Sequence, residues 1–163
     1  VRLELLCGRR AADYLSACWE QARQIGQSLS VKPEASFPAV SRMQAELLHA
    51  KECAARLEEQ SFAHTAAEYA GKGDTVLVTG PLEGDGARRL CDAVAQTCGG
   101  RCAVFAGEDG AYRYAVIHTG QDIRPLVKDM NDTLHGRGGG RDGFAQGSAA
   151  CTAEEIRVFF SRR

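Results

Sequence analysis

The apolar residues of this 163-residue chain change their spacing near residue 73, and this change constrains the fold more than any other feature. Before it, apolar residues recur every three or four positions, which is the spacing of one helix face. After it, short β-branched runs alternate with segments of helical spacing, a pattern typical of strands packed against helices. The sequence therefore predicts an α/β protein in which a long helical hairpin precedes a small mixed-sheet domain.

The first half predicts two helices joined by a proline-containing turn at residues 30–38. The first apolar stripe comprises Leu15, Cys18, Ala22, Ile25 and Leu29. The second comprises Met43, Leu47, Ala50, Ala54, Leu57, Ser61 and His64. The second helix is too long for the first to cover, so we expect its overhang to be buried by the other domain or by a second copy of the chain. A plain spacer is the alternative. His49 and His64 are interpreted as surface or seam residues.

Residues 1–6 alternate apolar and charged side chains, which predicts a strand with one buried face. No partner strand is evident in the helical segment that follows. We therefore expect residues 1–8 to be the remnant strand of an upstream domain. Residues 9–72 are then a helical hairpin that serves as linker and dimerisation element, and residues 73–163 form the α/β domain.

The second half predicts strands at 75–79, 101–106 and 111–118, with a hairpin turn at 107–110. Helical spacing predicts helices at 87–98 and 123–134. Thr152 and Glu155 form a capping box that starts a last helix.

Residues 135–148, HGRGGGRDGFAQGS, stand out by their glycine content. We interpret 136–147 as a glycine-rich loop whose amides bind an anion, flanked by two arginines suited to phosphate. An aromatic residue beside arginines is able to stack on a base, whereas a flexible solvated turn is the alternative interpretation. The candidate phosphate- or nucleic-acid-binding residues are Arg137, Gly138, Gly139, Gly140, Arg141, Asp142, Phe144, Gln146, Gly147 and His118.

The segment GRGGGRDGFAQGS resembles the GGGGR-P-x-x-A-Q-x-G signature near the C-terminus of alanyl-tRNA synthetases and free-standing alanyl-tRNA editing hydrolases. That signature belongs to the DHH-associated C-terminal domain, which DHH phosphoesterases also contain. The N-terminal VRLELLCGRRAADYL and the VKPE turn are similar to the segments that follow the editing domain in the same proteins. The resemblance therefore covers nearly the whole chain.

Two departures refine the expected function. Phosphoesterases of this group carry GGGH, and Arg141 stands where that histidine would be, which favours the alanyl-tRNA branch. The chain also lacks the H-x-x-x-H and C-x-x-x-H zinc motifs and the DHH motif. The resemblance thus implies that this chain itself is not catalytic and holds no cofactor. Zinc and aminoacyl-ester hydrolysis would belong to an upstream editing domain of the parent protein.

We therefore expect a non-catalytic module that binds tRNA or another nucleic acid and forms a homodimer through its helical hairpin. One alternative is the substrate-binding half of a DHH-type phosphoesterase acting on short oligonucleotides or nucleotides. A purely structural scaffold is the other. The formal net charge of −1 excludes binding by bulk charge, so a local basic patch must hold a polyanion.

The remaining features point to a cytoplasmic protein. Seven cysteines form no disulfide framework and no CxxC pair. No apolar run is long enough to cross a membrane, so no membrane partner is expected. A zinc site at Cys98 and Cys102 is not expected. Tyr112 and Tyr114 share one strand face, either as a stacking platform or as packed core residues. His135 is interpreted as a cation at a helix C-terminus.

Overall fold

The structure, a computed structural model, describes residues 5–141 and 143–162. The chain divides into two compact units, residues 1–56 (the helical unit) and residues 57–163 (the sheet unit). The boundary falls within one long helix rather than after it. The predicted boundary at 72/73 differs because the C-terminal end of that helix packs with the sheet unit.

The helical unit contains α1 (Gly8–Ser28), the short 3-10 helix η1 (Pro33–Ala35) and the first part of α2 (Ser36–Glu68). The turn that follows α1 packs closely against the end of that helix, where Gly26 is buried. A Cβ at Gly26 would lie 2.8 Å from the Val31 carbonyl oxygen, so only glycine fits there. Of the predicted remnant strand, residues 1–4 lie outside the described residues, and residues 5–7 belong to no helix or strand.

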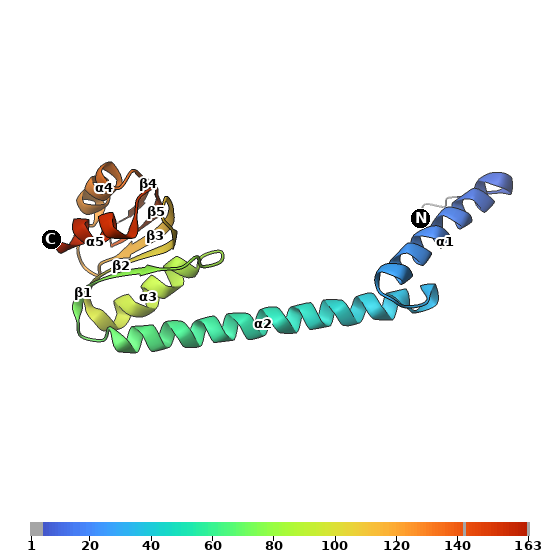
Figure 1. Cartoon of the computed structure of the whole chain (residues 1–163), viewed down its shortest axis with the longest axis horizontal. Helices are drawn as coiled ribbons and strands as arrows, with labels where there is room; N and C mark the ends of the chain where they lie inside the picture. The colour runs from blue at the N-terminus through green and yellow to red at the C-terminus, as the bar shows by residue number, and fades with distance from the viewer. Residues whose placement is uncertain (1–4, 142, 163) are drawn as a thin grey trace. The chain divides into compact units, whose positions relative to one another are not determined.

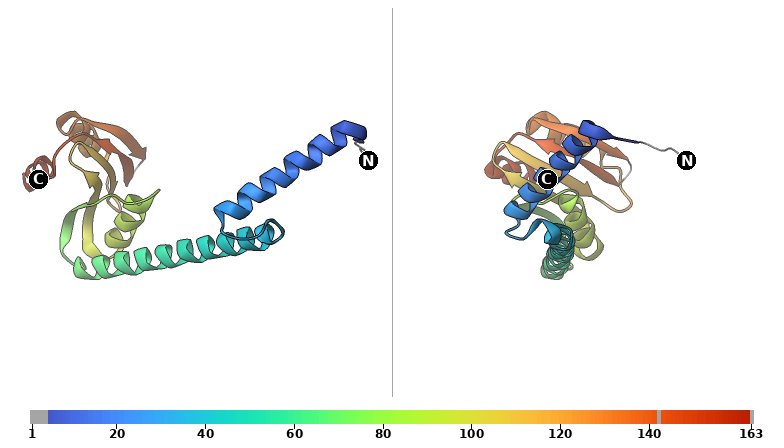
Figure 2. Two further views of the ribbon diagram at one scale, coloured as in Figure 1. Left: turned by 45° about the vertical axis from the view of Figure 1, so that its right-hand side comes forward. Right: turned by 90° about the vertical axis from the view of Figure 1, so that its right-hand side faces the viewer.

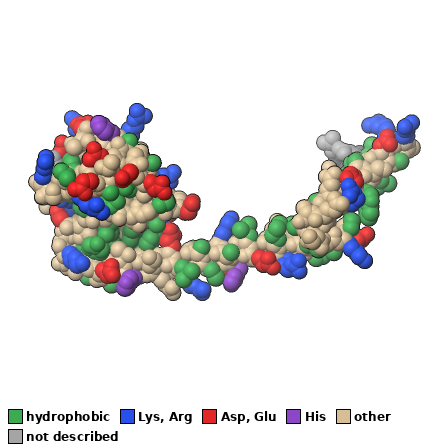
Figure 3. Space-filling view, viewed as in Figure 1, with side chains coloured by type: hydrophobic (Ala, Val, Ile, Leu, Met, Phe, Trp, Pro, Cys, Tyr) green, Lys and Arg blue, Asp and Glu red, His purple; other side chains and the backbone are tan. Residues whose placement is uncertain are grey.

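The two apolar stripes of the predicted hairpin do not bury one another. Figure 3 shows hydrophobic side chains at the surface of both helices. The large exposed apolar side chains of the helical unit that follow residue 10 are Tyr14, Leu15, Trp19, Ile25, Phe37, Met43, Leu47 and Leu48. A pattern of helical spacing predicts that a face is apolar, but it does not determine which surface covers that face.

The sheet unit holds a mixed five-stranded sheet in the order β1-β2-β3-β5-β4 (Figures 1 and 2). The strands are β1 (Gly73–Thr79), β2 (Gly99–Glu108), β3 (Ala111–Ile117), β4 (Gly136–Arg141) and β5 (Phe144–Ala149). β1 and β2 are parallel, and the other neighbours are antiparallel. The predicted α/β fold class is thus confirmed, and the sheet is larger than predicted by two strands.

Helices cover the two faces of this sheet unequally. On one face lie α4 (Arg124–Thr133) and α5 (Ala153–Ser161), whose core includes Phe105, Tyr114, Met130 and Ile156. On the other face α3 (Gly86–Cys98) packs on β2 and β3 through Leu90, Cys91 and Val94. Within the sheet unit, the contacts of α3 are with β1, β2 and β3, and β5 meets the core on the α3 side through Phe144.

The end of α2 completes the core on the α3 side, although it uses residues other than those predicted. Phe62 and Ala66 are buried against α3, whereas Ser61 and His64 of the predicted stripe are exposed. The hydroxyl of Thr97 also donates to the Ala66 carbonyl at 2.9 Å. These contacts explain why residues 57–68 belong to the sheet unit.

The predicted capping box at the start of α5 is confirmed. The Glu155 amide donates to the Thr152 hydroxyl at 3.3 Å, and the Glu155 carboxylate accepts from the Thr152 amide at 2.7 Å. The bonds to the Thr152 amide and hydroxyl hold the pKa of the Glu155 carboxyl below its ordinary value. Because this pKa is lower in the folded than in the unfolded chain, the charged carboxylate stabilises the fold.

We predict a pH-dependent effect of Glu155→Ala on thermal stability. Near neutral pH the variant should melt below the parent, because it lacks the charged half of the capping box. The stabilisation is complete above the unfolded-state pKa and is lost as the pH falls through the lowered folded-state pKa, so the two melting temperatures should converge in acid. Melting curves followed by circular dichroism measure this, and a difference that stays constant down to the acid transition would contradict it.

Candidate functional site

The glycine-rich segment forms the β4–β5 hairpin, and the predicted loop at 136–147 is wrong in this respect. β4 lies at the sheet edge and pairs with β5 over its whole length, from Gly136 opposite Ala149 to Arg141 opposite Phe144. Gly143 in the connection has a φ of +79°, a conformation that favours glycine. Glycine is depleted in strands in general, and this depletion is the reason why composition alone suggested a loop.

Every second residue of β4 faces α4 and leaves no room for a side chain. A Cβ on Gly138 would overlap the Tyr114 hydroxyl, and one on Gly136 would overlap the Asn131 side chain. Gly140 is closed in the same way by the backbone of β5, and a Cβ on Gly147 would lie 2.7 Å from Tyr114 Cζ. These glycines are therefore required for packing.

Besides its pairing with β5, the edge strand is held by a chain of two hydrogen bonds that runs through Asn131. The Tyr114 hydroxyl donates to Oδ1 of Asn131 at 2.8 Å, and Nδ2 of Asn131 donates to the Gly138 carbonyl at 3.1 Å. Burial raises the pKa of the Tyr114 hydroxyl, which keeps it protonated as a donor. The chain of bonds links β3, α4 and β4.

The alternate residues face the α3 side of the sheet. Three rows of side chains cross from β3 through β5 to β4: Arg113, Ser148 and Arg137; then Ala115, Gln146 and Gly139; then Ile117, Phe144 and Arg141. Directly opposite residues in antiparallel strands point to the same face. We call a group of seven residues on this surface, six from the strands and one from α3, the arginine face. It consists of Arg88, Arg113, Arg137, Arg141, Phe144, Gln146 and Ser148.

A groove of about 470 Å³ lies on the arginine face. Its charged lining comprises Arg88, Arg113, Arg137 and Asp85, and its floor includes Gln146 and Ser148. All six of these side chains are exposed. The groove is thus open, polar and lined by three guanidinium groups.

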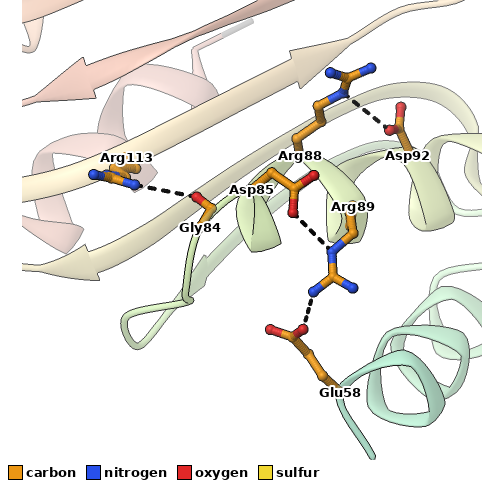
Figure 4. Close-up of polar contacts among 7 residues, drawn as sticks. All are labelled: Glu58, Gly84, Asp85, Arg88, Arg89, Asp92 and Arg113. Atoms are coloured by element: carbon orange, nitrogen blue, oxygen red, sulfur yellow. Dashed lines mark hydrogen bonds and ion pairs between the residues drawn. The ribbon is translucent and has the colours of Figure 1, made fainter. Parts of the chain in front are cut away.

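Asp85, Asp92 and Glu58 each lie close to a basic side chain (Figure 4). Asp85 lies 3.2 Å from Nε of Arg89, which also pairs with Glu58. Arg88 has Asp92 3.7 Å away, and its guanidinium carbon lies 5.2 Å from the centre of the Phe144 ring.

The arginines of the sheet strands are less engaged. Arg113 donates to the uncharged Gly84 carbonyl at 3.3 Å (Figure 4). Within the residues that the structure describes, Arg137 and Arg141 form no ion pair. Arginine presents several donors in a planar fork, which suits phosphate oxygens. These charges are therefore available to an anionic ligand.

The glycine amides are arranged differently from the predicted anion cradle. The carbonyl of Gly138 accepts from Asn131, so this residue directs its backbone groups away from β5. In an antiparallel pair such residues alternate with those bonded to the partner strand. The amide of Gly139 therefore points to β5, and those of Gly138 and Gly140 point off the sheet edge. The three amides do not converge on one point, and the arginines lie on a different surface.

The other predicted site residues lie around this hairpin. His118 follows β3, and its amide donates to the Gly143 carbonyl at 3.0 Å, so the structure places it beside the connection between β4 and β5. Asp142 lies outside the described residues. Tyr112 and Tyr114 are 5% and 2% exposed, so the stacking-platform alternative is wrong and both are core residues. His135 immediately follows the last turn of α4 with a φ of +51°.

Three residues of the arginine face were missed by the sequence analysis. Arg113 carried a signal, because it alternates with two buried tyrosines in a strand and must point away from their core. Ser148 belongs to the glycine-rich segment itself. Arg88 carried none, because only the packing of α3 on the sheet brings it to Phe144.

Comparisons with known proteins found similarity among solved structures. No family model matches the chain, and no curated protein matches it. Among solved structures, the chain is similar to the C-Ala domain of alanyl-tRNA synthetase from Aquifex aeolicus, with a TM-score of 0.46 and 18% sequence identity. The match covers 54% of this chain and 87% of that chain. The DHH-associated assignment stays a prediction.

Among residues 5–141 and 143–162, no three histidine, cysteine, aspartate or glutamate side chains gather as a metal site would require. No described helix has the length and apolar character that spanning a membrane requires.

We predict opposite outcomes for alanine at two adjacent glycines of β4. Gly138→Ala should lower the free energy of unfolding by about 1–3 kcal/mol, because its Cβ overlaps the Tyr114 hydroxyl. Gly139→Ala should change it by no more than about 0.5 kcal/mol, because its Cβ would meet nothing within 4 Å. Urea denaturation of both variants measures the difference. Equal losses would contradict the packing described here.

Proposed function

We propose that this chain is a non-catalytic nucleic-acid-binding module of an alanyl-tRNA editing or alanyl-tRNA synthetase-like protein, and that its arginine face binds the RNA. The observation that carries the proposal is the gathering of Arg113, Arg137 and Arg141 on one sheet face, with Arg88 of α3 beside them. The sequence resemblance of the glycine–arginine segment supports the same class. Phosphate contacts by such side chains supply most of the affinity in nucleic-acid binding.

A local patch of arginines also explains how a chain without net positive charge attracts a polyanion. A net charge of −1 gives no general attraction to a polyanion. On the arginine face, however, only Arg88 has an acidic partner among the described residues, Asp92, whereas Asp85 pairs with Arg89 and no ion pair engages Arg137 or Arg141. Few phosphates are contacted, so the affinity should depend on salt only moderately.

We predict that Arg137→Ala/Arg141→Ala weakens tRNA binding roughly tenfold or more at low salt, since each arginine supplies a charge-assisted contact to phosphate. Each lost phosphate contact lowers the slope of log K against log salt by about 0.7–0.9, so the slope should become shallower by roughly 1.5. Fluorescence anisotropy at several salt concentrations measures both quantities.

The matched control removes two positive charges from the covered face of the sheet. Lys128→Ala/Arg157→Ala changes exposed residues of α4 and α5 and has the same effect on net charge. This variant should bind tRNA as the parent does. Unchanged affinity in the Arg137→Ala/Arg141→Ala variant, or an equal loss in the control, would refute the proposed interface.

We also propose that the helical unit joins two copies of the chain. The supporting observation is the exposure of large apolar side chains on α1 and α2, where Leu15 is 67% exposed and Trp19 is 55% exposed. Burying a side chain of this size is worth about 1.5–3 kcal/mol, so a few of them are sufficient to stabilise a dimer.

We predict that Leu47→Glu shifts the chain from dimer to monomer in sedimentation equilibrium, because a carboxylate would have to be buried in the interface. His49→Glu is the control, since it adds a negative charge at an exposed position on the opposite side of the same helix from Leu47. It should leave the dimer intact. A parent chain that sediments as a monomer at all concentrations tested would refute the proposed dimer.

A further inference from the structure

The centre of the arginine face is occupied by an uncharged side chain, Gln146. It lies in the middle row on β5, between Ala115 of β3 and Gly139 of β4. Both neighbours are small, and a Cβ on Gly139 would meet no atom within 4 Å. The Gln146 side chain is exposed and lines the groove. No neighbouring side chain in its own row therefore shields the amide from a ligand.

The amide of Gln146 has no other role in the described part of the chain. None of the hydrogen bonds among residues 5–141 and 143–162 engages it. A glutamine side chain offers one acceptor and two donors. This combination matches the edge of a nucleobase, and the pairing of glutamine with adenine is the characteristic example because adenine presents an amino donor beside a ring-nitrogen acceptor.

Arginines surround Gln146 at distances that suit the phosphates on either side of such a base. Rows of side chains on a sheet face are about 7 Å apart along a strand, and strands are about 4.8 Å apart. Arg113 and Arg137 lie one row away from Gln146 on either side of β5, and Arg141 lies one row away in the other direction. A nucleotide seated over Gln146 therefore has guanidinium groups within reach on three sides.

The shape of the surface selects unpaired RNA. The face is an open stretch of sheet across three strands, and it cannot enter the deep and narrow major groove of an RNA duplex. Bases are read on open sheet faces only when they are unpaired, and arginine planes are able to stack on them. Arg88, which lies over the Phe144 ring at the rim of the groove, offers such a plane.

We propose that the arginine face binds an unpaired nucleotide of RNA and that the Gln146 amide determines specificity by pairing with the edge of an adenine. This inference rests on the proposed function and adds to it the strandedness and the base preference of the ligand.

The test compares single-stranded oligoadenylate and oligouridylate of equal length, together with a duplex of the two. Oligoadenylate should bind more tightly than oligouridylate by about 5- to 150-fold, the range expected for one bidentate base contact. The duplex should compete weakly. Fluorescence anisotropy of the full chain at fixed salt measures all three affinities.

Gln146→Leu keeps the size of the side chain and removes the amide. It should abolish the preference for adenine and leave the salt dependence of binding unchanged, because no arginine is altered. Gln96→Leu is the matched control, because it makes the same exchange at an exposed glutamine of α3 outside the arginine face, and it should keep the preference.

The outcomes separate this inference from the proposed function. If no oligonucleotide and no tRNA binds, the proposed function fails and this inference with it. If RNA binds with the arginine dependence expected above, but the parent shows no adenine preference or the Gln146→Leu variant retains one, the role of Gln146 is overturned and the nucleic-acid-binding function stands. Equal binding of duplex and single strand would overturn the selection of unpaired RNA.

Discussion

The close approach of β4 to β5 and α4 is the contact on which the candidate site depends. It is possible because Gly136, Gly138 and Gly140 face the covered side of the sheet, where a Cβ would overlap Asn131, Tyr114 or the β5 backbone. The hydrogen bonds from Tyr114 through Asn131 to the Gly138 carbonyl hold the strand there. With β4 in this position, its two arginines project from the opposite face.

The same arrangement separates packing residues from exposed arginines within one short segment. Residues that face α4 serve the core, and the residues on the opposite side include the exposed Arg137 and Arg141. An edge strand with exposed backbone groups is prone to pair with other chains, and charged side chains on it reduce that tendency. Arg137 and Arg141 meet this requirement while they supply the charge of the arginine face.

Much of the fold follows from local patterns. The helices α1, α3 and α4, the strands β1 to β3 and the capping box at Thr152 all lie where hydrophobic spacing, glycine turns and cap residues predicted them. The hairpin β4–β5 was not predicted, because its glycines remove the alternation that identifies a strand. The burial of Phe62 and Ala66 was also not predicted, since the predicted stripe of α2 continued through Ser61 and His64.

The sequence by itself determined that an α/β fold follows a long helical segment and that a cluster of glycines and arginines near the C-terminus is the chemically distinctive part of the chain. These conclusions follow from local spacing and residue type. The tertiary structure alone decided which face each residue of that cluster occupies. Strand register sets every second side chain on one face, and the placement of α3 leaves part of that face uncovered. Hence the common surface formed by the four arginines depends on packing between segments that are distant in the sequence.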